Sequence, residues 1–561
     1  MSEIRSERVT GDRFLARVIH AAGVTHSFHV PTVLLPALSE MDHLGIRLIS
    51  AHGEKAAAYM ADGYARAALR PGLCMAQAVG GANLASGLKD AYMAGSPVIA
   101  LTGGPYTQSR FKHVYQEIKD YSFFDHVTKW HASIESVERL PDLVRQAFRV
   151  ATTGAPGPVH LEVRGHWGQA ISSEADLEFI LEPRFTAVPA FRPQPEPAAI
   201  DEALRELAAA SRPVIVAGGG VINSGAEAEL VQIAEKLSIP VVTSLNAKSA
   251  IPDAHPLSIG SSGLYSRRCA NEVLNAADLV FFVGSRAGSL VTTNWQIPRP
   301  GTTVIHLDIE PSELGRHYPA KVALNGDVKV TLTSLIARSA ARSNPSWIEH
   351  ARELVRRWRD EVRPRMESEQ SPIRPERICA EIARVLPDDG AVVVDTLQAS
   401  IWAGSMMGLN GGKQRFIRCA GSLGWGLPAA IGAKCALGRR SVVGFTGDGG
   451  AYYHLAELET AARYGINAVI VINNNGAYAG ERVIWDEPYH GEQTEEGLRS
   501  WNFGDINFAK IAEEMGCIGI RVDRANTLAD ALRRGLAADK PVLIDVVSDP
   551  SAIHPKGWSA A

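Results

Sequence analysis

The sequence lacks the features that would tie a protein to a membrane or to an oxidising compartment. Its six cysteines are scattered without a C-x-x-C pair, which argues against a zinc ribbon or a disulfide scaffold and for a reducing compartment. No run of about 18 apolar residues is present, so no membrane-spanning helix is expected. The opening stretch, MSEIRSERVTGDRF, has no apolar core of a secretory signal, so we expect a cytoplasmic protein.

The sequence also has no strong excess of charge of one sign. A formal net charge of −4 over 561 residues gives no reason to expect nucleic acid or an anionic membrane as a partner. With 46% hydrophobic and 21% charged residues, the composition is that of a globular protein. The chain is too long for one hydrophobic core, so several domains are expected.

Short apolar runs alternate with helical patterns along almost the whole chain, as in PVIALTGG, DLVFFVGS and SVVGFTGDG. Strands buried on both faces and separated by helices are typical of parallel α/β sheets. Two linkers, the proline-rich 186–198 and the shorter 342–347, divide the chain. We therefore predict three doubly wound parallel-sheet domains, at 1–185, 199–341 and 366–561.

The first and last thirds of the sequence resemble each other. MAQAVGGANLASGLKDAYMAGSPVIALTGG follows the same plan as VGFTGDGGAYYHLAELETAARYGINAVIVINNN: a strand, a glycine turn, a helix and a second strand. The first copy has Val79 where the last has Asp448. We expect two domains of one fold, of which only the last carries a metal-binding group.

Polar residues follow two neighbouring strands in the last third. Asp448 lies in Gly-Asp-Gly-Gly, and Asn475 ends the next apolar run. Ligands of parallel sheets bind beyond the carboxyl ends of the strands, where a carboxylate, an amide oxygen and the main-chain carbonyl of Ala477 would suit Mg²⁺ with phosphate oxygens. A strand–turn–helix with incidental polar ends is the alternative.

The same turn is suited to a phosphate group. Gly447 and Gly449 let the backbone approach a ligand without a Cβ in between. A helix predicted to start near Ala451 would offer free N–H groups and the positive end of its dipole.

The spacing of GDG and NN resembles the thiamine diphosphate fingerprint, and nearly the whole chain resembles the acetolactate synthase branch of the thiamine diphosphate-dependent enzymes. That branch includes 2-oxo acid decarboxylases, benzaldehyde lyase and oxalyl-CoA decarboxylase. The resemblance implies a pyrimidine-binding N-terminal domain, a central domain and a diphosphate-binding C-terminal domain. It also implies thiamine diphosphate and Mg²⁺ as cofactors, and a homodimer or homotetramer with the cofactor between subunits.

The resemblance assigns the acid that activates the cofactor. HGEKAAAYMADGYARA matches the family pattern in which a glutamate precedes Met-Ala by six residues, so Glu54 would bond to the aminopyrimidine ring. An acidic residue in the first turn of a helix, where it complements the dipole, is the alternative.

The resemblance also implies other cofactor contacts. In CAGSLGWGLPAA, the carbonyl of Gly421 would accept from the amino group of the pyrimidine, and Leu423 would bend the cofactor. In DTLQASIW, Gln398 and Ser400 are candidates for the diphosphate, although the usual family histidine is Ala399 here. Around the metal motif, the implied contacts are Gly447, Asp448, Gly449, Gly450, Asn475, Ala477 and Tyr478.

On the substrate side, Gln116 matches a family glutamine that faces the reacting centre, or it is an ordinary surface residue. Glu481 lies where decarboxylases keep a proton-transferring glutamate, or it forms an ion pair with Arg482. His29 and His113 lie in segments that reach the cofactor in relatives, and each has a structural role as its alternative.

Departures from the family pattern limit the prediction of the substrate. The chain has AVGGAN without the proline of acetolactate synthases, and GSRAGSLVTTNW lacks the paired aspartates of the flavin-containing enzymes, although Arg286 remains. These departures disfavour bound FAD, which stays an alternative because of Arg286. The leading prediction is a carboligase acting on a 2-oxo acid. A decarboxylase or a thioester lyase is the alternative, and a non-catalytic relative is disfavoured because Glu54, Asp448 and Asn475 are all present.

Overall fold

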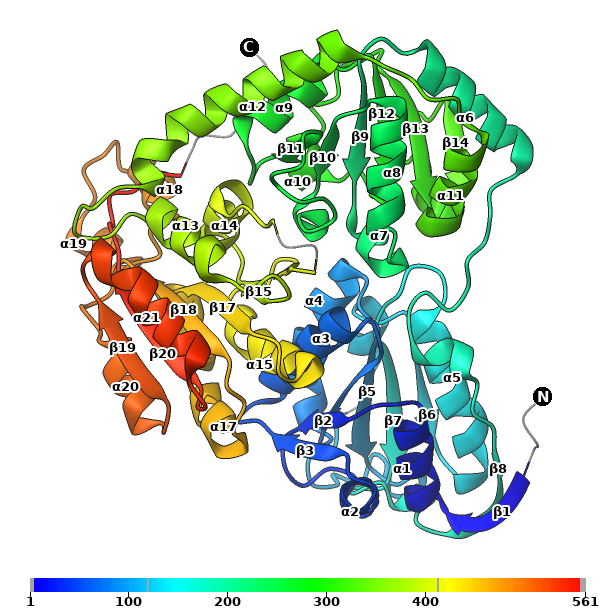
Figure 1. Cartoon of the computed structure of the whole chain (residues 1–561). Coiled ribbons are helices and arrows are strands. Elements are labelled where there is room, and N and C mark those ends of the chain that lie inside the picture. Colours follow the sequence, from blue (N-terminus) through cyan, green and yellow to red (C-terminus); the bar gives the residue numbers. More distant parts are fainter. Residues whose placement is uncertain (1–4, 119–120, 411–412, 555–561) are drawn as a thin grey trace.

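The computed structural model describes residues 5–118, 121–410 and 413–554 and contains three six-stranded parallel sheets, each flanked by helices (Figure 1). The predicted fold class is therefore confirmed. The N-terminal, central and C-terminal sheets lie in that order along the chain. The exact domain limits stay a prediction.

The N-terminal sheet has the strand order β3-β2-β4-β5-β7-β6. Its strands are β2 (His26–His29), β3 (Arg47–Ser50), β4 (Gly72–Ala76), β5 (Val98–Gly104), β6 (Trp130–Ile134) and β7 (Val159–Arg164). Its helices are α1 (Gly11–Ala21), α2 (Leu35–His43), α3 (Glu54–Ala68), α4 (Gly80–Ala94) and α5 (Leu140–Thr152). An antiparallel pair, β1 (Arg5–Thr10) and β8 (Glu174–Phe179), lies beside this sheet and was not predicted.

The C-terminal sheet repeats this topology, with the order β16-β15-β17-β18-β20-β19. Its strands are β15 (Ala391–Val394), β16 (Arg415–Arg418), β17 (Val442–Gly447), β18 (Val469–Asn474), β19 (Ile518–Val522) and β20 (Val542–Val547). Its helices are α13 (Pro375–Val385), α14 (Gln398–Met406), α15 (Gly426–Leu437), α16 (Asp448–Ala451), α17 (Glu457–Tyr464), α18 (Arg482–Asp486), α19 (Glu495–Arg499), α20 (Phe508–Glu514) and α21 (Ala525–Ala537). The internal resemblance in the sequence thus reflects two domains of one fold.

The central sheet has a different order, β11-β10-β9-β12-β13-β14, which reads 3-2-1-4-5-6 along the chain and is typical of dinucleotide-binding folds. Its strands are β9 (Pro213–Ala217), β10 (Val241–Thr243), β11 (Ser258–Ser261), β12 (Leu279–Val283), β13 (Thr303–Asp308) and β14 (Val322–Asn325). Its helices are α6 (Pro197–Ala209), α7 (Gly219–Ser224), α8 (Glu227–Leu237), α9 (Arg268–Ala276), α10 (Ser289–Thr292) and α11 (Val328–Arg338). The long α12 (Pro345–Met366) then runs from the central toward the C-terminal domain (Figure 1).

Helices α3 and α15 join the N-terminal and C-terminal domains near the centre of the molecule (Figure 1). Their backbones approach closely because small residues face each other. A Cβ on Gly63 would lie 2.1 Å from the carbonyl oxygen of Ala429, and one on Gly432 would lie 1.9 Å from that of Met60. Larger residues at either glycine would force the two helices apart.

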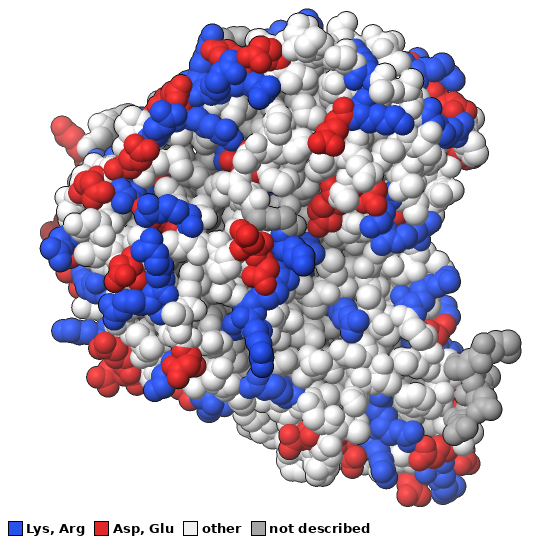
Figure 2. Space-filling model, viewed as in Figure 1, with Lys and Arg blue, Asp and Glu red and all other residues white. Residues whose placement is uncertain are grey.

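Acidic and basic side chains are interspersed over the face shown in Figure 2, as the near-neutral composition predicts. Of the helices in the described part of the chain, none combines the length and the apolar character needed to cross a bilayer.

Candidate active site

The predicted metal ligands converge at the carboxyl ends of β17 and β18, which are adjacent in the sheet. Asp448 is buried, and its Oδ2 accepts a hydrogen bond from the N–H of Ala477 at 3.1 Å. The same N–H lies 3.2 Å from Oδ1 of Asn475. A carboxylate and an amide oxygen therefore meet around one backbone segment, and their role as metal ligands stays a prediction.

Burial raises the pKa of Asp448 to about 6. A buried carboxylate favours a cation partner, because a nearby positive charge lowers the free energy of the ionised form. The described residues contain no group of three or more His, Cys, Asp or Glu side chains that could hold a metal alone. A metal at Asp448 would thus depend on amide, carbonyl and ligand oxygens, the donor set that Mg²⁺ prefers.

The glycines of the motif differ in what surrounds them. A Cβ on Gly449 would lie 2.3 Å from the ring of Tyr478, and one on Gly450 would lie 2.6 Å from Oγ1 of Thr446. A Cβ on Gly447 would meet no atom of the described residues within 4 Å. Gly449 and Gly450 are therefore required by the protein's own packing, whereas open space adjoins Gly447, on the side where a ligand is predicted.

The helix after this motif starts earlier than predicted. One helical turn, α16, begins at Asp448 itself, and a 3₁₀ turn at Tyr452–His454 separates it from α17. The prediction of a start near Ala451 was wrong by one turn, because the two glycines after Asp448 were read as part of the loop.

Asp395, which the sequence analysis missed, organises the neighbouring turn. It follows β15, is buried, and accepts hydrogen bonds from the N–H of Gly424 at 3.2 Å and the hydroxyl of Thr446 at 2.9 Å. Burial raises its pKa to about 6. Its position directly after an apolar strand is the same signal that identified Asp448.

The two diphosphate candidates on α14 behave differently. Gln398 begins the helix, and its buried Oε1 has no hydrogen-bond partner among the described residues. The hydroxyl of Ser400, in contrast, donates to the carbonyl of Asp395 at 2.6 Å, inside a fully buried environment. The structure therefore leaves the Gln398 side chain available to a ligand but does not bring the Ser400 hydroxyl to the site.

Glu54 is the first residue of α3, where its charge complements the helix dipole. Its Oε2 accepts from Nδ2 of Asn83 at 3.2 Å, and a Cβ on Gly80 would lie 2.4 Å from its Oε1. Asn83, which the sequence analysis did not single out, thus orients the carboxylate. Among the described residues, no hydrogen bond joins Glu54 to Asp448 or Asn475.

Within residues 419–422 of the loop between β16 and α15, one carbonyl oxygen is a free acceptor. The carbonyl oxygens of Cys419 and Ala420 accept from the guanidinium of Arg418, and that of Ser422 accepts from the N–H of Trp425. Among the hydrogen bonds of the described residues, none ends on the carbonyl oxygen of Gly421. This is the oxygen predicted to accept from the cofactor.

Leu423 follows in the same loop and is only partly buried. An apolar side chain held partly exposed beside a free carbonyl fits its predicted role as a wedge, which stays a prediction.

The substrate-side candidates of the N-terminal domain differ in burial and in their hydrogen bonds. His29 ends β2, is buried with its Nδ1 unpartnered, and has its pKa lowered to about 4 by burial. Gln116 has a left-handed backbone (φ 61°) and a buried, unpartnered Oε1. His113 is exposed on the same loop. His29 and Gln116 therefore keep unsatisfied polar atoms, which a ligand could satisfy.

Glu481 lies directly before α18 and is partly buried. Its alternative role was an ion pair with Arg482. That pair does not form, and Arg482 pairs with Asp486 at 3.7 Å instead. The Glu481 carboxylate is thus left without an ionic partner among the described residues.

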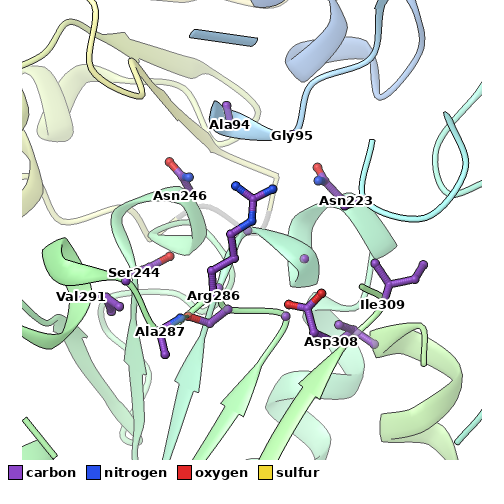
Figure 3. Close-up of a pocket in the computed structure, with 18 of the residues that line it drawn as sticks. Ala94, Gly95, Asn223, Ser244, Asn246, Arg286, Ala287, Val291, Asp308 and Ile309 are labelled. Atoms are coloured by element: carbon purple, nitrogen blue, oxygen red, sulfur yellow. Dashed lines mark hydrogen bonds between the residues drawn. The ribbon is translucent and has the colours of Figure 1, made fainter. Parts of the chain in front are cut away.

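A separate cavity of about 360 Å³ opens where the central domain meets the end of α4 and the end of β16, and Glu54, Asp448 and Asn475 do not line it. It lies at the carboxyl ends of β9 and β12, where the strand order reverses and doubly wound folds bind their ligands. Figure 3 shows Arg286 extending across it toward Ala94 and Gly95, with Asp308 below. Arg286 also donates to the carbonyl of Met93 at 3.1 Å, which ties this cavity to the end of α4.

All three domains match one enzyme family. Residues 9–123 match the N-terminal TPP binding domain of the thiamine pyrophosphate enzymes, 200–335 match their central domain, and 395–546 match their C-terminal TPP binding domain. The resemblance inferred from the motifs is confirmed.

The chain is similar to acetolactate synthases over nearly its full length. It is 32% identical to a probable acetolactate synthase large subunit of Methanocaldococcus jannaschii, covering 97% of this chain and 93% of that one. It is 31% identical to an acetolactate synthase of Mycobacterium bovis (96% and 88%) and 29% identical to an acetolactate synthase large subunit of Lactococcus lactis (98% and 95%). The chain therefore belongs to the acetolactate synthase superfamily of thiamine diphosphate-dependent enzymes, which catalyse carboligation or decarboxylation.

Proposed function

We propose that the protein is an acetolactate synthase-like carboligase that takes a 2-oxo acid, with pyruvate as the first candidate, and joins its acyl part to a second carbonyl compound. The observation that carries this proposal is the full-length similarity to acetolactate synthases, at 32% identity over 97% of the chain. The convergence of Asp448 and Asn475 on one N–H supports it from the structure.

The residues at the ends of β17 and β18 fit a metal-bound diphosphate. Asp448, Asn475 and the carbonyl of Ala477 would hold Mg²⁺, and Gln398 would donate its amide N–H to a diphosphate oxygen. The open space beside Gly447 leaves room for the diphosphate.

Thiamine diphosphate, when bound, supplies an electron sink for the carbanion left when a bond beside a carbonyl breaks. Glu54, held by Asn83, would hold a proton at the aminopyrimidine ring. The free carbonyl of Gly421 would accept from the amino group and orient it. Gln116 and His29, with their unpartnered buried atoms, would bind the substrate's polar groups.

The proposed activity and its alternative require different groups from the chain beside the reacting carbon. A decarboxylase needs a side chain that holds a proton there, whereas a carboligase needs groups that bind a second carbonyl compound. Glu481, which has no ionic partner among the described residues, would supply that proton, so a simple decarboxylase stays the second candidate.

We propose further that the central cavity binds a nucleotide cofactor, of which FAD is one. The 3-2-1-4-5-6 strand order, the glycines 218–220 after β9, and the buried carboxylate of Asp308 at the end of β13 support this. An ionised carboxylate accepts hydrogen bonds, so Asp308 would accept one from a hydroxyl group of the nucleotide. Visible absorbance of the purified protein would reveal a flavin, and chromatography of the acid-released nucleotides would identify any other occupant.

We also propose a homodimer or a homotetramer of such dimers in which two chains complete each site. Large apolar side chains near the predicted cofactor residues are exposed, including Val79 (48%) and Tyr92 (44%) on the α4 side and Tyr453 (49%) after α16. Such side chains are expected at a subunit interface. A cytoplasmic location, suggested by the unpaired cysteines, stays a prediction.

The proposed function is tested by turnover of pyruvate by the reconstituted protein. Reaction should require both thiamine diphosphate and Mg²⁺, and the product should be acetolactate. Acetaldehyde as the product would establish the decarboxylase instead. If neither product forms when both cofactors are present, both proposals about the substrate fail.

A further inference from the structure

Asp90 connects the N-terminal domain to the loop that carries the free Gly421 carbonyl. It lies in α4 and is fully buried. Its carboxylate accepts hydrogen bonds from three successive backbone N–H groups of the C-terminal domain, those of Ala420 (2.9 Å), Gly421 (3.0 Å) and Ser422 (3.0 Å). Successive N–H groups directed at one anion form an anion-binding nest.

The charge on Asp90 is balanced within the same domain. Arg66 of α3 donates to its Oδ1 at 2.8 Å and to Asp62 at 2.6 Å. Burial disfavours the charged form of Asp90, but Arg66 and the N–H groups together hold its pKa below the ordinary value. Asp62 in turn accepts from Nε1 of Trp425 at 2.8 Å. The loop is therefore clamped from both sides by groups on α3 and α4.

This arrangement sets the direction of the Gly421 carbonyl. A peptide unit is planar and trans, so the C=O of one residue points opposite to the N–H of the next. The N–H of Ser422 points at Asp90. The carbonyl of Gly421, in the same peptide unit, must then point away from Asp90.

We propose that Asp90 is a positioning residue for catalysis, which aims the Gly421 carbonyl at the amino group of bound thiamine diphosphate. This inference rests on the proposed function. Asp90 does not touch the cofactor in this account, and it acts only through the peptide unit of Gly421 and Ser422. The neighbouring carbonyls are occupied by Arg418 and Trp425, so no other acceptor in residues 419–422 could replace it.

Replacing Asp90 by asparagine should turn this peptide unit without removing side-chain volume. The amide has one acceptor oxygen in place of two. In one orientation its NH₂ group faces the N–H groups of Gly421 and Ser422, and in the other it faces Arg66 and the N–H of Ala420. Two donors oppose each other in both cases, so the loop must shift.

The test measures exchange of the C2 proton of thiamine diphosphate bound with Mg²⁺, followed in D₂O by acid quench and NMR. We expect Asp90→Asn to slow this exchange by roughly tenfold to a hundredfold, as displacements of about 1 Å do in active sites, at full cofactor occupancy. The control is Glu376→Gln. Glu376 lies in α13, and its fully buried carboxylate pairs with the guanidinium of Arg374 at 2.9 Å. It should leave the exchange rate unchanged.

A merely structural role predicts a lower melting temperature for Asp90→Asn with an unchanged exchange rate at saturation, and that result would overturn the proposal. If wild-type protein itself shows no accelerated exchange, the proposed function fails instead.

If the Asp90→Asn variant does not fold, amide hydrogen exchange of the wild-type apoprotein tests whether Asp90 orders the loop. We expect slow exchange of the Gly421 and Ser422 N–H groups before any cofactor is added. Fast exchange that becomes slow only on binding would show that the cofactor, not Asp90, orders the loop.

Discussion

The side-chain amide of Asn83 donates to Oε2 of Glu54 at 3.2 Å, so a residue of α4 orients the carboxylate that begins α3. This contact holds the predicted activating acid in place before any cofactor binds. Glu54→Gln keeps the shape and removes the acid. We expect turnover to fall by roughly 10²- to 10⁴-fold, the usual contribution of a positioned acid or base, while thiamine diphosphate still binds.

The matched control is Glu178→Gln, on the exposed face of β8 in the same domain. It should leave turnover and cofactor affinity unchanged. Full activity of Glu54→Gln would show that the role assigned to Glu54 is wrong.

Gly447 offers a test of where the diphosphate lies. An added Cβ would lie more than 4 Å from every atom in the described part of the chain, and the φ of −84° is open to any residue. Gly447→Ala should therefore leave the melting temperature of the apoprotein unchanged but weaken thiamine diphosphate binding, because the methyl group enters space reserved for the ligand. Titration calorimetry would measure the loss.

Gly504→Ala is the control for this substitution, since its Cβ would also meet nothing within 4 Å. If both variants bind thiamine diphosphate with equal affinity, the diphosphate does not lie beside Gly447.

Mixed dimers test whether two chains share one site. A Glu54→Gln chain retains Asp448, and an Asp448→Ala chain retains Glu54. If each site takes Glu54 from one chain and Asp448 from the other, a hybrid of the two inactive chains regains one intact site and about half the activity of a wild-type dimer. Differently tagged chains, co-expressed and purified through both tags, would give the hybrid. An inactive hybrid would place both residues of a working site in one chain.

Lys248 predicts a pH dependence of stability. Its Nζ donates to the carbonyl of Gly404 at the end of α14 at 2.9 Å, and burial, reinforced by Arg267, lowers its pKa from 10.5 to about 7. Between these values the unfolded chain binds the proton and the folded chain does not, so the free energy of unfolding rises with pH. The destabilisation from charged Lys248 is thus fully present below pH 7 and is relieved as pH rises.

Lys248→Met removes the titrating group and with it this pH-dependent destabilisation. The melting temperature of the wild type relative to this variant should therefore increase from pH 7 to pH 10. The underlying difference in the free energy of unfolding rises by at most about 1.4 kcal/mol per pH unit. The exposed Lys540→Met should show no such trend. A difference that stays constant or falls with pH would show that Lys248 remains charged in the folded protein.

The sequence predicted those parts of the fold that depend on local patterns. Long apolar runs became β5, β12 and β18, because strands buried on both faces need uninterrupted apolar residues. The four-residue β2 and β3, HSFH and RLIS, carry polar residues and were not recognised. The pairing of β1 with β8 joins segments far apart in the chain, so no local sequence pattern predicts it.

The candidate site also has features that local sequence patterns predict and features that they do not. Asp448 and Asn475 could be predicted to meet because each follows a strand and the strands are neighbours. The hydroxyl of Ser400 turned inward, a choice of side-chain direction that helix periodicity does not determine. The clamp of Asp90 on residues 420–422 joins two domains through contacts between side chain and backbone, which sequence spacing cannot reveal.

The stoichiometry of pyruvate turnover tests the central claim most directly. Purified protein with thiamine diphosphate and Mg²⁺ would receive pyruvate, and CO₂ release and pyruvate consumption would be followed together. Carboligation joins two pyruvates with the loss of one CO₂, so we predict that two pyruvates disappear for each CO₂ released and that acetolactate accumulates. One CO₂ for each pyruvate, with acetaldehyde as the product, would contradict the account and make the protein a decarboxylase.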